Sequence, residues 1–65
     1  MMTRTTYIIY DERAALGVTA GAEVLETCET MREAKETVQL YYPMGVIYEY
    51  EVGKDGKLRN ERMVK

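Results

Sequence analysis

The side chains that carry most nucleophilic, general-base and transition-metal chemistry are nearly missing from this chain. Its 65 residues include no His, no Ser and a single Cys, Cys28. Without His or Ser, neither a Ser–His–acid triad nor a Cys–His pair can be built, and a zinc site would need several Cys or His ligands. Cys28 lies two residues before a predicted helix cap, where a thiol can become reactive. A small, semi-buried residue at a strand–helix junction is the favoured interpretation.

Carboxylates are the remaining candidates for catalysis, and they form two groups. One is the adjacent pair Asp11 and Glu12; the other is Glu49 with Glu61. Acid–base or Mg²⁺ chemistry would require them to converge in a cleft, which so small a domain seldom has. The glycine-spaced loop 16–21 has no Lys after its second Gly, so we expect a flexible connection rather than a phosphate-binding loop. We therefore expect a non-catalytic protein with no catalytic residue, cofactor or metal site; a small enzyme using these carboxylates is the disfavoured alternative.

Charge is distributed unevenly, although the net charge is only −2. Residues 23–36 hold five Glu against two basic residues, whereas residues 53–65 hold five basic residues against two acidic ones. Basic side chains interleaved with Tyr are found on surfaces that bind nucleic acids. An isoelectric point of about 5.1 disfavours that function, because affinity for phosphates is mainly electrostatic. The nucleic-acid alternative would use Lys54, Lys57, Arg59 and Arg62.

Two strands are predicted in the N-terminal half. Residues 5–10 are β-branched or aromatic throughout, which is a strong strand signal. Residues 22–28 alternate roughly enough to favour a second strand, although several of them are also good helix formers. Between the two lies a connection that contains Gly17 and Gly21.

A helix is predicted from about Met31 to Tyr42. Thr30 and Glu33 match a capping box, in which the hydroxyl accepts from the Glu33 N–H and the carboxylate reaches back to the Thr30 N–H. Pro43 ends the helix. One apolar stripe along it consists of Met31, Ala34, Val38 and Tyr41.

The C-terminal segment predicts a hairpin whose loop length fixes the register. A two-residue loop would pair Tyr48 with Met63. We favour a three-residue loop with a left-handed Gly56, despite the repulsion between two of the opposed glutamates. That register pairs Val52 with Leu58, Glu51 with Arg59 and Glu49 with Glu61.

These elements predict an α+β fold. It is a two-layer ββαββ domain spanning residues 1–65, in which one helix covers one face of a four-stranded antiparallel sheet. The strand order stays open. No stretch is long and apolar enough for a membrane span, and a lone thiol without an apolar leader segment predicts a cytoplasmic protein.

Six Tyr with no Phe or Trp suggest a contact surface, because Tyr tolerates a surface that is apolar but wet. We expect the helix to cover the face that carries Tyr48 and Tyr50. That leaves Tyr7, Tyr10 and Tyr42 as the tyrosines expected to be exposed.

Self-association is predicted from the small size of the domain. A chain of 65 residues buries a small core, and neither a disulfide nor a zinc site is open to it. Segment 7–10 is apolar on both faces, so one helix would leave part of it wet. We expect a homodimer with Tyr7 or Ile9 at the contact, and a predicted interface of Tyr7, Ile9, Tyr10 and Tyr42.

The whole chain resembles the small uncharacterised proteins of bacteriophages and bacterial mobile elements. The resemblance is carried by segments 7–12, 23–27, 33–35 and 46–50, and it is one of size and style. It implies a non-enzymatic protein that binds an unidentified protein partner, in some cases as an inhibitor of a host protein.

Overall fold

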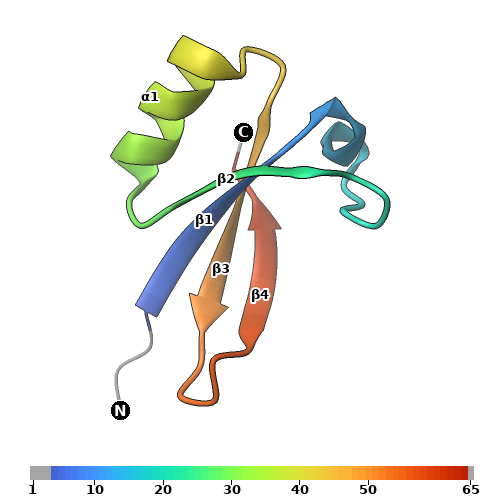
Figure 1. The fold of residues 1–65 in the computed structure, drawn as a ribbon. Helices are drawn as coiled ribbons and strands as arrows, with labels where there is room; N and C mark the ends of the chain where they lie inside the picture. The colour runs from blue at the N-terminus through green and yellow to red at the C-terminus, as the bar shows by residue number, and fades with distance from the viewer. Residues whose placement is uncertain (1–3, 65) are drawn as a thin grey trace.

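The computed structural model describes residues 4–64, and it confirms the α+β fold with a ββαββ order. One helix packs on a four-stranded antiparallel sheet whose strand order is β2-β1-β3-β4 (Figure 1). The central strands are therefore β1 and β3, and the two edges are β2 and β4. The elements are β1 (Arg4–Tyr10), the 3₁₀ helix η1 (Glu12–Leu16), β2 (Val24–Cys28), α1 (Met31–Tyr41), β3 (Val46–Val52) and β4 (Leu58–Met63). None of the helices in this part of the chain is long and apolar enough to cross a bilayer.

The predicted cap of α1 is present in part. The Thr30 hydroxyl accepts a hydrogen bond from the Glu33 N–H at 3.1 Å. The Glu33 carboxylate accepts from the N–H of Glu29 at 3.3 Å, not from that of Thr30 as expected. At the other end, the apolar stripe closes with Tyr42 instead of Tyr41. Tyr42 leaves the helix with a φ of −136° and a ψ of 68° and packs against the core, whereas Tyr41 stays 70% exposed.

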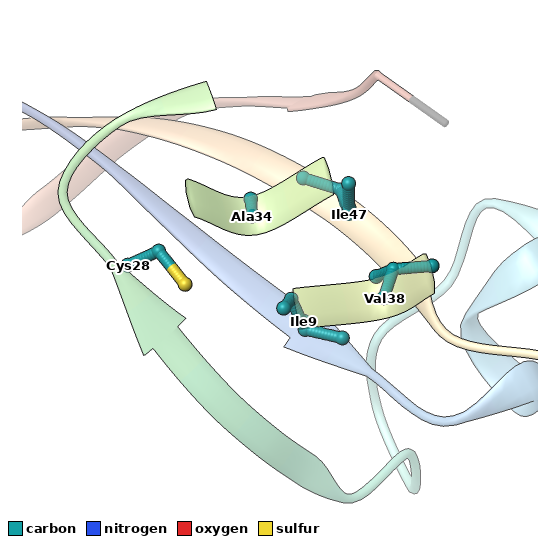
Figure 2. Packing of buried hydrophobic residues seen from close by; sticks show 5 residues of the cluster. All are labelled: Ile9, Cys28, Ala34, Val38 and Ile47. Carbon is teal, nitrogen blue, oxygen red and sulfur yellow. The ribbon is translucent and has the colours of Figure 1, made fainter. Parts of the chain in front are cut away.

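The helix covers the sheet face that carries Ile9 and Ile47. These two residues are cross-strand partners and fully buried. Figure 2 shows them beneath Ala34 and Val38 of α1, with Cys28 of β2 completing the cluster. Burying an aliphatic side chain of this size contributes about 1.5–3 kcal/mol, so this contact is what fixes α1 on the sheet.

The expectation that α1 would cover Tyr48 and Tyr50 is therefore wrong, since they lie on the opposite face. They are nevertheless 2% and 6% exposed, because η1 and the following loop cover that end of the face. Tyr48 donates its hydroxyl proton to the carbonyl oxygen of Ala14 in η1 at 2.8 Å. The ring of Tyr10 meets that of Tyr48 edge to face, with centroids 5.4 Å apart.

The segment predicted as an irregular connection forms η1 for local reasons. The Asp11 side chain accepts from the Arg13 N–H at 3.1 Å and caps the N-terminus. Gly17 ends the 3₁₀ helix with a φ of 90°, a left-handed conformation that suits glycine. One turn is enough to bring the fully buried Ala14 over the tyrosine rings.

The β3–β4 hairpin follows the predicted register only near its loop. Val52 pairs with Leu58 and Glu51 with Arg59, as expected, and Gly56 is left-handed with a φ of 80°. A bulge then shifts the register, so Glu49 faces Arg62 and not Glu61. Asn60 sits in the bulge with a φ of 54°, a conformation that Asn tolerates better than most residues. The bulge replaces a like-charge pair with an ion pair.

Candidate functional site

The structure separates the carboxylates that could have formed a catalytic group. Glu49 points to the helix side of the sheet, where it binds Arg62 and accepts from the Tyr7 hydroxyl at 3.0 Å. Glu61 points to the other side and accepts from the Tyr50 hydroxyl at 2.8 Å. Hydrogen bonds from Arg62 and Tyr7 lower the pKa of Glu49. Within residues 4–64 no three His, Cys, Asp or Glu side chains gather as metal ligands would.

Cys28 has the environment of an inert thiol. It is 7% exposed, and its sulfur lies between the sheet and α1 (Figure 2). Burial raises its pKa, outweighing the contact with the Thr37 hydroxyl at 3.9 Å, which acts in the opposite direction. A reactive thiol would need the reverse shift.

The four residues of the predicted interface do not form an exposed surface. Ile9 is fully buried under α1, and Tyr10 lies 9% exposed in the tyrosine cluster. Tyr7 and Tyr42 are half-buried and pack against the helix-side core. The expected exposure of Ile9 and Tyr10 is wrong, because α1 covers the other face than predicted and η1 covers Tyr10.

The basic residues proposed for nucleic-acid contact are partly neutralised. Arg59 pairs with Asp55 at 2.9 Å, and Arg62 pairs with Glu49 at 2.6 Å. Lys54 and Lys57 lie exposed at the hairpin loop, without an ion pair to any other described residue. Two of the four cations are thus already engaged within the chain.

One surface stands out for its pattern. The N-terminal part of β1 and the β3–β4 hairpin extend away from α1 and η1, so both sheet faces are bare there (Figure 1). On the helix side, that part of the sheet presents a polar row of Thr5, Glu51 and Arg59, which are cross-strand partners and exposed. On the opposite side it presents an apolar surface, here called the open sheet face, made of Thr6, Ile8, Thr27, Val52, Leu58 and Met63.

The open sheet face is hollowed into a shallow groove of about 350 Å³. Ile8 and Val52, on the two central strands, are only half-buried, and Leu58 and Met63 are 45% and 44% exposed. Arg4 and Glu29 also line the groove, and neither forms an ion pair with another described residue. Central strands normally bury such side chains, so this face lacks a cover.

Sequence reasoning missed this surface, although a signal for it was present. Segment 7–10 does leave an apolar residue wet, but that residue is Ile8 and not Ile9. Because successive residues of a strand point to opposite faces, only one of the two isoleucines can lie under α1, and that one is Ile9.

No protein-family model matches this chain, and neither the curated proteins nor the solved structures include a significantly similar protein.

Proposed function

We propose that this chain is a non-catalytic interaction protein that forms a homodimer through its open sheet face. The observation that carries the proposal is the contrast between the two bare faces of the projecting sheet. Both faces are bare, yet the paired residues Glu51 and Arg59 on the helix side are charged. The next pair along the same strands, Val52 and Leu58, lies on the other side and is apolar. An apolar face on a bare sheet is typical of a surface that another molecule covers.

A second copy fits the charges at the rim of this face. Arg4 and Glu29 line the same groove and have no ion-pair partner among the described residues. A two-fold contact is reciprocal, so a pairing of Arg4 with Glu29 of the other copy would occur twice. A face carrying one cation and one anion is therefore complementary to itself.

The size of the face predicts a weak dimer. Four strands spaced by about 4.8 Å and a length of about five residues give a face of roughly 20 by 16 Å. The area of this face is less than half of the roughly 800 Å² that each partner contributes to a stable interface. We expect a reversible dimer with a dissociation constant in the micromolar range or weaker.

Sedimentation equilibrium on matched variants tests the proposal. Leu58→Lys places a cation on the open sheet face, and Gln39→Lys places the same cation on the exposed side of α1, outside the groove. Both residues are exposed, so neither change should unfold the chain. Wild type and Gln39→Lys should show a concentration-dependent mass above that of the monomer, and Leu58→Lys should stay monomeric. Monomer mass in all three, or equal dimerisation in all three, would contradict the proposal.

The charge pair offers a second arm of the same experiment. Arg4→Glu and Glu29→Arg should each weaken the dimer, and the double variant should restore it if the two side chains meet across the two-fold axis. An additive loss in the double variant would refute that contact.

The inhibitor role implied by the phage-type resemblance, and the cytoplasmic location, stay predictions.

A further inference from the structure

A second groove lies at the opposite end of the central strands from the open sheet face. It has a volume of about 570 Å³ and is called here the acidic groove. One side comes from the end of β1 and the start of η1, and the other from the turn between α1 and β3. Its lining consists of Asp11, Glu12, Arg13, Leu25, Tyr42, Pro43, Met44 and Gly45.

The turn side of the groove is held rigidly. The Gly45 N–H donates to the Tyr42 carbonyl oxygen at 2.7 Å and closes the turn. A Cβ on Gly45 would lie 3.0 Å from both Ile9 Cγ2 and this carbonyl oxygen, so the turn is in close contact with the core. The groove is therefore preformed, as binding sites usually are.

The η1 side of the groove is fixed and negatively charged. Two side-chain hydrogen bonds, of 2.6 and 3.0 Å, hold Arg13 to Asp11 and neutralise that pair. The Asp11 N–H donates to the Glu23 carbonyl oxygen at 3.0 Å, which brings Glu23 beside it. Neither Glu12 nor Glu23 forms an ion pair with another described residue. The hydrogen bonds to Asp11 raise the pKa of Arg13, and the charges of Glu23 and Glu12 add to the rise.

Apolar side chains gather at the same end of the molecule. Leu25 is half-buried in the groove, and Met44 beside it is 67% exposed. Leu40 and Tyr41, in the last turn of α1, are each 70% exposed. A flexible thioether such as that of Met44 adapts to side chains of different shape. Exposed apolar side chains next to a preformed groove mark a site of interaction.

We infer that the acidic groove binds a basic, amphipathic peptide segment of another protein. An apolar side chain of the peptide would lie against Leu25 and Met44, and flanking Lys or Arg side chains would face Glu12 and Glu23. The inference rests on the proposed interaction function but not on the dimer. A second copy is a poorer occupant. Its Arg59 and Arg62 are already paired. Of its described cations outside any ion pair, Arg4 lies at the open sheet face and Lys35 stands between the buried Ala34 and Glu36. The other two, Lys54 and Lys57, sit on a hairpin loop of Gly and Asp residues.

Fluorescence polarisation with three labelled heptapeptides tests the inference. The probe alternates Lys and Leu, one control replaces Leu with Ser, and the other replaces Lys with Glu. We expect the Lys–Leu peptide to bind about tenfold more tightly than either control at low salt. Titrations are run on the wild-type chain while its mass is followed in parallel, so that dimerisation and peptide binding are separated.

Variants of the groove locate the binding. Glu12→Lys and Met44→Ser should each weaken binding of the Lys–Leu peptide by about three- to tenfold. Glu36→Lys, on the exposed side of α1, changes the net charge by the same amount as Glu12→Lys and should leave affinity unchanged. Leu16→Ser is the matched apolar control, since Leu16 is 89% exposed and outside the groove.

Two results would overturn the inference. Equal losses in Glu12→Lys and Glu36→Lys would show general electrostatic attraction, and equal binding of the Leu and Ser peptides would show that the apolar lining plays no part. A dimer with no peptide binding would refute this inference alone, whereas peptide binding by a strict monomer would refute only the proposed dimer.

Discussion

The hydrogen bond from Tyr48 to η1 offers the sharpest test of how the tyrosine cluster is held together. Tyr48 is 2% exposed, and its hydroxyl donates to the Ala14 carbonyl oxygen at 2.8 Å. Tyr48→Phe keeps the ring and its edge-to-face contact with Tyr10 but removes this donor. The variant therefore isolates the bond that ties η1 to the sheet.

The expected loss of stability depends on whether the Ala14 carbonyl oxygen still accepts a hydrogen bond in the variant. An intramolecular hydrogen bond contributes about 0.5–1.5 kcal/mol net, and more is lost when a buried partner is left unsatisfied. The Ala14 oxygen still accepts from the Gly17 N–H at 3.1 Å, so that larger penalty does not apply. We expect the free energy of unfolding to fall by about 1 kcal/mol, and the melting temperature by about 4–8 °C in a domain of this size.

Urea denaturation followed by circular dichroism measures this loss. Tyr41→Phe is the matched control, because Tyr41 is 70% exposed, and it should be neutral within about 0.5 kcal/mol. All proteins are compared at one concentration, since dimerisation would itself stabilise the fold. A Tyr48→Phe variant as stable as the control would refute the proposed attachment of η1. A loss above about 3 kcal/mol would show that the ring itself had moved.

Three further predictions concern other parts of the core. Gly45→Ala should destabilise the fold by about 1–3 kcal/mol in thermal melts, because its Cβ would lie 3.0 Å from core atoms; Gly53→Ala, whose Cβ would meet flexible side chains, should cost clearly less. Burial raises the pKa of Tyr48 and Tyr50, so the native state keeps phenol protons that the unfolded chain loses. The contribution of these two phenols to the free energy of unfolding should be constant below pH 10.0. Above that pH it should fall by at most about 1.4 kcal/mol per pH unit for each phenol, as urea titrations at several alkaline pH values would show. Cys28 should react with a disulfide reagent at least about tenfold more slowly in the native state than in urea, and a native rate matching the urea rate would contradict its burial.

Local sequence signals predicted the elements well. The Thr30 cap, the β-branched segment 5–10 and Pro43 each act on their own neighbourhood, and each marks an element boundary to within a residue or two. The boundaries of β1 and α1 followed from these signals without knowledge of the fold.

Features that depend on tertiary packing were not predictable in the same way. In the sequence both sheet faces look apolar: one carries Ile9 and Ile47, and the other carries the tyrosines. Either face could therefore have packed against α1. In the structure η1 covers the tyrosine face by burying Ala14 there, and α1 covers the isoleucine face. Five residues with two alanines give too weak a local signal for a covering element.

The hairpin bulge shows a third limit. The two candidate registers each predicted part of the pairing: Val52 with Leu58 from one, and Tyr48 with Met63 from the other. A bulge joins them at Asn60, and the gain is an ion pair between Glu49 and Arg62. A repulsive pair in a predicted register can thus itself predict a bulge.

A dilution series of amide NMR spectra, from millimolar to micromolar protein, tests whether the open sheet face is the contact surface. We expect concentration-dependent shifts at Ile8, Val52, Leu58 and Met63, with the amides of α1 unchanged. Spectra that do not change with concentration, or shifts confined to α1, would contradict this expectation.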